Sequence, residues 1–267
     1  MVIFKTDTEG RARRAIAEAD MIFCLDFNAV SRLEILSDTI AANTTARRVL
    51  IDHHLSPDEG FDLMFSHPDS SSTCFLVYSI VEAMCGAGAI TRRMAESLYV
   101  GMMTDTGNFA FSFLTPELFR AVAVLVEKGI SISDIHNSVY NAYTEGRARL
   151  FGYAINRKME VIQDGTVAYM SLLENEMRRF QFQQGDSEGF VNYPLSIRGI
   201  RMSAMFIQTK HSIRVSLRSR GEVDVNVFAR RYFDGGGHRN AAGGKSYVPM
   251  NETLENFRKY LREYFGA

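Results

Sequence analysis

The sequence predicts an α/β protein of two domains, an N-terminal domain with a doubly wound parallel sheet and a smaller C-terminal α/β domain with a mixed sheet. In the first half of the chain, short apolar runs alternate with longer segments of helical composition, which is typical of βαβ units. In the second half, residues 213–218 alternate strictly between apolar and polar side chains, which predicts a half-buried strand. This change of pattern places the domains at 1–145 and 146–267.

The first elements follow from the order of these runs. Residues 9–19 have helical composition and lead into an apolar strand at 21–25, which stops at Asp26. Residues 32–42 predict a second helix before a strand at 48–52. The carboxyl ends of parallel strands meet at the edge of the sheet where ligands bind, so polar residues that follow these strands are candidates for a site.

Helix start signals organise the rest of the first domain. The Ser and Thr residues at 70–73 are expected to cap a helix over 74–84, and Thr115, followed by proline, starts another helix. Residues 91–102 also have helical composition, and the apolar run at their end continues into Asp105. Three apolar segments of this domain therefore lead into an acidic residue.

The second domain begins with a connecting helix over 145–160, followed by strands at 166–173 and within 201–219. Residues 198–239 contain nine Lys or Arg residues and three acidic ones. A solvated strand face explains single arginines here, whereas Arg218 lies on the alternating face, next to Ser219. A basic patch of this size suits a mononucleotide or a short oligonucleotide, whose phosphates Arg side chains hold.

The composition is that of a compact globular protein, with 46% hydrophobic and 23% charged residues and a net charge of −1. No apolar stretch reaches the roughly 18 residues that a membrane span needs, and the start has no signal-peptide pattern. The three cysteines show no C-x-x-C spacing. Reduced thiols in a cytoplasmic protein are the expected explanation.

The triplet Asp52-His53-His54 is the most informative feature of the first domain. It follows the apolar run at 49–51 and brings two imidazoles and a carboxylate to one strand end. Together with Asp26 and Asp105, it predicts a site assembled from separate loops for a divalent metal such as Mn²⁺ or Zn²⁺. Adjacent histidines also occur as ordinary surface residues, which is the alternative interpretation.

The C-terminal third has a matching signal. Residues 233–244 contain five glycines, with His238 and Arg239 among them. A helix C-cap followed by a flexible turn needs fewer glycines than this. Consecutive glycines let several backbone N–H groups point at one anion, and phosphate is the natural candidate.

Taken together, these motifs resemble the DHH phosphoesterase family, in the branch that carries the DHH-associated C-terminal domain. Within that family the chain is most similar to the bacterial group of oligoribonucleases and 3′-phosphoadenosine-5′-phosphate phosphatases. The resemblance covers nearly the whole chain. It rests on Asp26, Asp52-His53-His54, Asp105-Thr106-Gly107, Arg218-Ser219, Asp224-Val225-Asn226, Gly235 to His238 and Asn240 to Gly243.

The resemblance implies a manganese-dependent phosphodiesterase or phosphatase, exonuclease-like in its action. Asp26 and Asp105 would bridge two Mn²⁺ ions, His53 would bind one of them, and Asp52 would orient an imidazole. His54 would contact the scissile phosphate or protonate the leaving oxygen. The implied site residues are Asp52 and His54 as catalytic residues, Asp26, His53 and Asp105 as metal ligands, and Arg218, Ser219, Gly235, Gly236, Gly237 and His238 as substrate-binding residues.

One motif of the family has no counterpart. Family members begin with a strand and a His-x-x-x-Asp-x-Asp loop that supplies both metals, whereas only 25 residues precede Asp26 here and none of them fits. The expectation is therefore a first domain truncated by its first strand and motif, with one Mn²⁺ ion or none.

Three functions follow from these observations. The first is a phosphoesterase that hydrolyses short single-stranded RNA or 3′,5′-nucleoside bisphosphates. The second is a non-catalytic nucleotide-binding fragment, because the first metal-binding motif is absent. The third is an enzyme of the same family that acts on breakdown products of cyclic dinucleotides or on polyphosphate. The Gly-Gly-Gly-His loop argues against the related inorganic pyrophosphatases, whose second domain is of another type.

Other residues have two interpretations each. Arg32 would reach a phosphate or lie exposed at a helix start. The residues at 71–73 would bind an anion at a helix N-terminus or simply cap the helix. Phe109 and Phe111, which follow Asp105, would stack on a base or pack in the core.

Overall fold

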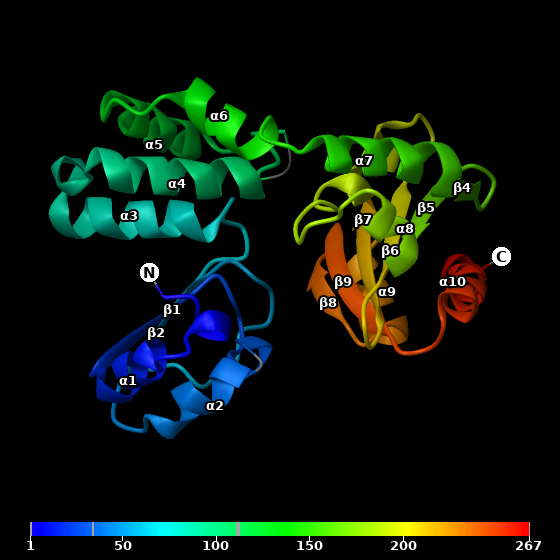
Figure 1. The fold of residues 1–267 in the computed structure, drawn as a ribbon. Coiled ribbons are helices and arrows are strands. Elements are labelled where there is room, and N and C mark those ends of the chain that lie inside the picture. The colour runs from blue at the N-terminus through cyan, green and yellow to red at the C-terminus, as the bar shows by residue number, and fades with distance from the viewer. Residues whose placement is uncertain (1, 34, 111–112, 267) are drawn as a thin grey trace. The chain divides into compact units, whose positions relative to one another are not determined.

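The computed structural model describes residues 2–33, 35–110 and 113–266, which form two compact units, one up to Val139 and the other from Tyr140 (Figure 1). The sequence places this boundary six residues later, between residues 145 and 146, at the start of the connecting helix. The α/β class and the two-domain layout predicted from the sequence are confirmed, since each unit has its own sheet.

The first unit is built around a three-stranded parallel sheet in the order β1-β2-β3. The central strand β2 is buried from Val49 to Asp52, while β1 at the edge exposes Met21, Phe23 and Leu25. The elements are η1 Phe4–Thr6, α1 Arg11–Glu18, β1 Met21–Leu25, η2 Val30–Leu33, α2 Ile35–Ala42, β2 Arg47–Asp52, β3 Leu63–Ser66, α3 Thr73–Cys85, η3 Ala87–Ala89, α4 Arg92–Asp105, α5 Pro116–Glu127 and α6 Ile132–Tyr140.

The predicted helix starts in this unit are confirmed. Ser72 caps α3, with its hydroxyl accepting a hydrogen bond from the backbone N–H of Phe75 at 3.0 Å. Thr115 caps α5 with Pro116 in the first turn. The apolar run before Asp105 belongs to helix α4, which continues three residues beyond its predicted end. The strand β3 is absent from the sequence-based assignment because it has only four residues, all at least partly exposed.

The second unit contains a mixed sheet in the order β4-β5-β6-β7-β9-β8, in which only β5 and β6 pair in parallel. Helices α9 and α10 pack on one face of this sheet, and α7, α8 and η4 pack on the other. The elements are α7 Glu145–Lys158, β4 Met159–Ile162, β5 Val167–Leu172, α8 Glu174–Arg179, η4 Phe190–Ser196, β6 Met202–Gln208, β7 Ile213–Ser219, α9 Val225–Tyr232, β8 Gly236–His238, β9 Ala241–Ser246 and α10 Met250–Phe265.

The alternation predicted for β7 is confirmed. Ile213, Val215 and Leu217 are buried against α9 and α10, whereas Arg214 and Arg218 project from the other face of the strand. The burial on one side provides the driving force that fixes the register, because a slip of one residue would turn both arginines into the apolar core.

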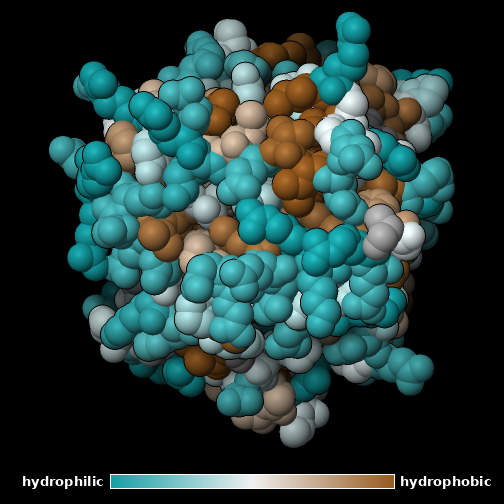
Figure 2. Space-filling model, turned by 90° about the vertical axis from the view of Figure 1, so that its right-hand side faces the viewer, coloured by the Kyte–Doolittle hydropathy of each residue, from teal (hydrophilic) through white to brown (hydrophobic). Residues whose placement is uncertain are grey.

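The surface that Figure 2 presents is mostly hydrophilic, with hydrophobic side chains gathered in smaller areas between the polar ones. Exposed apolar groups of this kind are normal for a folded chain. Within the described ranges, none of the helices combines the length and the apolar character needed to cross a lipid bilayer.

The glycine-rich stretch forms the β8–β9 hairpin rather than a flexible turn. A Cβ atom added at Gly235 would lie 1.9 Å from the carbonyl oxygen of Gly243, and one at Gly237 would lie 2.4 Å from that of Ala241. Gly237 also has a φ of +154°, a conformation that other residues rarely adopt. Glycine is therefore required here for close approach of the two backbone segments.

Substitution of Gly235 by Ala is expected to destabilise the second unit by at least about 1–3 kcal/mol, because the hairpin must separate to admit the methyl group. The matched control is Gly152→Ala on α7, where an added Cβ meets no atom within 4 Å. That change is expected to stabilise the protein by up to about 1 kcal/mol through helix propensity. Urea unfolding of both variants provides the measurement, and equal stability of Gly235→Ala and the parent chain would contradict the assignment.

Candidate active site

Three donor side chains of the first unit converge from separate elements. Asp26 directly follows β1, His53 directly follows β2, and Asp105 is the last residue of α4. The Nε2 atom of His53 lies 3.6 Å from Oδ1 of Asp26 and 3.7 Å from Oδ2 of Asp105. One donor atom from each of the three residues can be chosen so that all lie within 4.8 Å of one another.

A backbone contact on the side of the ring away from the two carboxylates orients His53. Its Nδ1 atom lies 3.2 Å from the carbonyl oxygen of Ser70. Because a carbonyl only accepts hydrogen bonds, Nδ1 carries the proton and donates it. This contact selects the tautomer in which the lone pair is on Nε2, the atom that faces the two carboxylates. Metal-binding histidines in proteins are commonly held by a contact of this kind.

Asp26 begins the loop after β1 with a left-handed backbone, at a φ of +65°. Its N–H still donates to the carbonyl oxygen of Ile51 at 3.2 Å, which continues the pairing of β1 with β2 by one residue. Its carboxylate, although 56% exposed, accepts a hydrogen bond from the hydroxyl of Thr73 at 3.0 Å. Asp is one of the residues that tolerate the left-handed conformation, which turns its side chain out of the strand alternation.

Asp52 and His54 form a second pair beside these donors. Asp52 is fully buried, and its Oδ1 accepts a hydrogen bond from Nδ1 of His54 at 2.7 Å, while its Oδ2 accepts from the backbone N–H of His54 at 3.1 Å. Burial by itself would raise the pKa of Asp52, but the hydrogen bonds from His54 and from the backbone of His53 lower it. The carboxylate is thus held ionised, and it fixes the imidazole of His54.

The pKa of Asp105 is shifted in the opposite direction to that of Asp52. Burial raises its pKa, and the nearby negative charge of Asp26 raises it further, against the opposing effect of His53 and His54. The same two carboxylates, together with burial, raise the pKa of the Cys74 thiol to about 11. Two acidic groups so close to each other repel when both are ionised, and a divalent cation between them would remove that repulsion. The donor set of two carboxylates and one imidazole fits Mn²⁺ or Zn²⁺.

In the second unit, the register of the sheet aligns the polar residues in one row. His238 on β8 pairs with Ala241, which pairs with Arg218 on β7, which pairs with Ser203 on β6. Residues that pair directly across strands project from the same face. His238 and Arg218 therefore share one face of the sheet, separated by the small side chain of Ala241.

Arg218 is a half-buried cation that no carboxylate of the described residues neutralises. Burial lowers its pKa, and its guanidinium donates to the carbonyl oxygen of Leu217 at 2.9 Å. Within residues 2–33, 35–110 and 113–266, no carboxylate lies at ion-pair distance from it. Ser203 beside it is fully buried, and its hydroxyl has no hydrogen-bond partner among the described residues. A bound anion would compensate the desolvated charge.

Two other predicted substrate-binding groups already have partners within the second unit. The hydroxyl of Ser219 donates to the carbonyl oxygen of Val223 at 2.6 Å and accepts from the amide of Asn240 at 2.8 Å. The N–H of Gly237 donates to Oδ1 of Asn226 at 2.9 Å. These three bonds shape the turns around the hairpin, and a direct contact of Ser219 or Gly237 with a substrate stays a prediction.

For two of the three remaining residues with two interpretations, the structure shows the contacts. Arg32 is exposed and donates to Oδ1 of Asn28 at 3.2 Å. The ring of Phe109 packs against Tyr99 and Phe119, with both centroids at 5.9 Å, as expected for its core interpretation. Phe111 lies outside the described residues.

Thr73 was interpreted from the sequence as a capping or anion-binding residue, and its contact with Asp26 was missed. No sequence pattern predicts that contact, because 47 residues separate the two positions. Ser203 was also missed, because the sequence shows only one polar residue in an apolar strand. Its position beside Arg218 follows from the pairing of β6 with β7.

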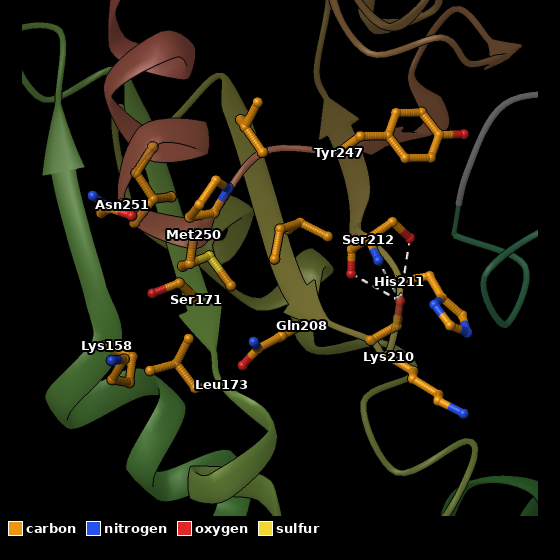
Figure 3. A pocket seen from close by; sticks show the side chains of 15 residues that line it. Lys158, Ser171, Leu173, Gln208, Lys210, His211, Ser212, Tyr247, Met250 and Asn251 are labelled. Carbon is orange, nitrogen blue, oxygen red and sulfur yellow. Dashed lines mark hydrogen bonds between the residues drawn. The ribbon is translucent and has the colours of Figure 1, made fainter.

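A pocket of about 620 Å³ lies elsewhere in the second unit, between the β6–β7 turn and the start of α10 (Figure 3). Lys158, Ser171, Gln208 and Met250 are among its lining residues, and none of the predicted site residues contributes to it. Arg218 is five residues along β7 from the lining residue Ile213, a separation of roughly 17 Å in a strand.

Comparison with known proteins identifies the family. The model of the DHH family N-terminal domain matches residues 3–102, and that of the DHHA1 domain matches residues 164–267. An exopolyphosphatase-related protein from Bacteroides fragilis, known from its crystal structure, has 41% sequence identity to this chain. The two structures superpose with a TM-score of 0.90, and the match covers 96% of this chain and 75% of that one.

Curated relatives are more distant. The bifunctional oligoribonuclease and PAP phosphatase NrnA of Bacillus subtilis is 28% identical over 203 residues, which cover 76% of this chain and 63% of the relative. The cyclic-di-AMP phosphodiesterase GdpP of the same organism is 29% identical over 229 residues, 81% of this chain and 32% of the relative. The chain thus spans less than two thirds of the length of these relatives. With both family domains matched and a relative at 41% identity, the chain belongs to the DHH family and carries a DHHA1 domain.

Proposed function

We propose that this chain is a metal-dependent phosphoesterase that hydrolyses short oligoribonucleotides and 3′,5′-nucleoside bisphosphates. The observation that carries the proposal is the convergence of Asp26, His53 and Asp105 from three separate elements, with the Asp52–His54 pair beside them. The names of the NrnA relatives support this substrate class, and the family supports the reaction type.

Asp26, His53 and Asp105 would hold the metal, for which we propose Mn²⁺. When bound, the ion would polarise the phosphoryl group and lower the pKa of a water molecule. The chain's own residues prepare the site for it: Ser70 keeps the lone pair of His53 on Nε2, and the proximity of the two carboxylates favours a cation. We infer a single ion, held by Asp26, His53 and Asp105, because both carboxylate oxygens of Asp52 in the other donor set already accept hydrogen bonds from His54.

His54 is the proposed proton donor or phosphate contact. The ionised Asp52 holds a proton on Nδ1 of His54, so Nε2 is the atom that exchanges protons. An imidazole supported in this way can protonate a leaving oxygen or hold a phosphate oxygen, and general acid catalysis of this type contributes roughly 10²–10⁴-fold to rates.

Arg218 and His238 are the proposed anchors for a second phosphate of the substrate. Their common face, the partial burial of the guanidinium and the unpartnered hydroxyl of Ser203 in the described residues support an anion at this position. A phosphate-binding position in the second unit is in keeping with a substrate that has more than one phosphate group, such as a nucleoside bisphosphate or a short RNA.

The first test is hydrolysis of 3′-phosphoadenosine-5′-phosphate and of an RNA of about three nucleotides in the presence of Mn²⁺, with linear and cyclic dinucleotides as further substrates. Turnover that depends on Mn²⁺ and falls at least about 100-fold in Asp105→Ala is the expected result. Nucleotide binding without turnover would instead favour a non-catalytic nucleotide-binding chain. A preference for the dinucleotides would reassign the substrate.

Substitution of Arg218 by Ala is expected to raise KM by about 10–100-fold, since a charge-assisted hydrogen bond contributes about 1.5–3 kcal/mol. The matched control is Arg214→Ala, on the same face of β7, where the guanidinium is exposed and donates to Ser187. Steady-state kinetics compare the two variants. An unchanged KM in Arg218→Ala would remove this residue from the proposed substrate site.

The metal-free site is expected to limit stability at neutral pH. A carboxyl with a raised pKa in the folded state contributes stability at low pH and loses it as the pH rises through that pKa. Asp105→Asn should therefore melt at a higher temperature than the parent chain at pH 7 with EDTA, and this gain should vanish near pH 3. Each kcal/mol corresponds to about 2–4 °C for a chain of this size.

Asp52→Asn is the control for this measurement, and the expected change in melting temperature has the opposite sign. The pKa of Asp52 is lowered in the folded state, so its ionised form contributes stability that is lost as the pH falls. Asp52→Asn should therefore melt at a lower temperature than the parent chain at pH 7. Thermal denaturation by circular dichroism measures both variants, and a destabilised Asp105→Asn at pH 7 would show that the two carboxylates do not repel as described.

A further inference from the structure

The segment Ser70–Thr73, at the start of α3, does more than cap a helix. Capping requires a single side chain, and Ser72 provides it by accepting from the N–H of Phe75. The neighbours of Ser72 point their polar groups at the donor cluster instead: the carbonyl of Ser70 accepts from His53, and the hydroxyl of Thr73 donates to Asp26. One short segment thus contacts two donors that come from two different strands.

The contact of Thr73 with Asp26 links a buried hydroxyl to an exposed carboxylate. Thr73 is only 5% exposed, whereas the side chain of Asp26 is 56% exposed. An exposed carboxylate in a left-handed loop position rotates readily about its side-chain bonds unless something holds it. Among the residues that the structure describes, Thr73 makes the only side-chain hydrogen bond to this carboxylate.

The oxygen that Thr73 contacts is also the one that faces the histidine. Oδ1 of Asp26 accepts from Thr73 at 3.0 Å and lies 3.6 Å from Nε2 of His53. A hydroxyl donor occupies one lone pair of this oxygen and leaves its other lone pair, and both lone pairs of Oδ2, directed elsewhere. The bond therefore selects the rotamer of Asp26 that meets His53 and Asp105 without blocking a cation.

We propose that Thr73 is a positioning residue that holds Asp26 in its metal-binding conformation. This inference rests on the proposed metal site of the first unit. Partners that orient metal ligands typically change metal affinity by about 10–100-fold when they are removed. Thr73 acts through Asp26 and touches neither the ion nor the substrate.

The test is the affinity of the purified chain for Mn²⁺ in calorimetric titrations without substrate. Thr73→Val keeps the shape of the side chain and removes the donor, so affinity should fall about 10–100-fold. Thr73→Ser restores the hydroxyl and should restore affinity to within about threefold of the parent chain. Ser79→Ala is the matched control on α3, because its hydroxyl donates to the carbonyl of Phe75 and contacts no donor residue.

A double-mutant cycle separates positioning from a general loss of structure. In an Asp26→Asn background, Thr73→Val should cause little further loss of affinity, since the residue through which it acts is already altered. Losses that add in full would overturn the proposal, and so would parental affinity in a folded Thr73→Val chain. If circular dichroism shows that Thr73→Val does not fold, Thr73→Ala replaces it in the same cycle.

The outcome also distinguishes this inference from the proposed function. A parent chain that binds no Mn²⁺ in the titration contradicts the proposed metal site itself, and with it the role of Thr73. A parent chain that binds Mn²⁺ together with an unaffected, folded Thr73→Val variant contradicts the role of Thr73 alone and leaves the metal site standing.

Discussion

The parallel pairing of β1 with β2 is the constraint on which the candidate site depends. Leu25 pairs with Ile51, and the backbone of Asp26 adds one more hydrogen bond to Ile51. Because the two strands run in the same direction, the residues that follow them emerge at the same edge of the sheet. This brings Asp26 beside the Asp52-His53-His54 triplet, although about 25 residues separate them in the chain. A slip in this pairing would separate the donors.

Each unit holds charged side chains whose charge is not neutralised within the described residues, negative in the first unit and positive in the second. In the first unit, two carboxylates come together around an imidazole, which costs stability unless a cation is present. In the second unit, a half-buried guanidinium has no carboxylate beside it in the described residues, which costs stability unless an anion is present. Structures usually avoid both arrangements, and sites that bind ligands retain them because the ligand supplies the missing charge. The two features are independent of each other, and both are in keeping with the proposed phosphate substrate and its metal ion.

The sequence predicts those parts of the fold that depend on local signals. Helix caps at Ser72 and Thr115, the strand ends at Asp26 and Asp52, and the alternation of β7 depend on neighbouring residues, and the structure has them where expected. The β8–β9 hairpin was not predicted because glycines have no side-chain periodicity and their conformation is decided by the strand they pack against.

The candidate site shows the same division. Asp26, His53 and Asp105 were identified because acidic and histidine residues at the ends of apolar runs are unusual. The contacts that orient these side chains are not predicted by the sequence. A hydroxyl at the start of a helix is typical of a cap, and only the folded chain determines that Thr73 contacts Asp26. Arg218 was recognised by its alternating strand, while its neighbour Ser203 depends on strand pairing that no local pattern reveals.

The close backbone approach at Gly235 and Gly237 has a consequence for recognition. The glycines of this hairpin have no side chains with which to distinguish one ligand from another. The face beside it offers main chain, one imidazole and one guanidinium, all of which respond to charge and to the position of phosphate oxygens. Contacts of these groups with phosphate oxygens fix the position of a ligand and carry no base-sequence information directly. On the proposed function, a surface built in this way would discriminate mainly by the number and spacing of negative charges.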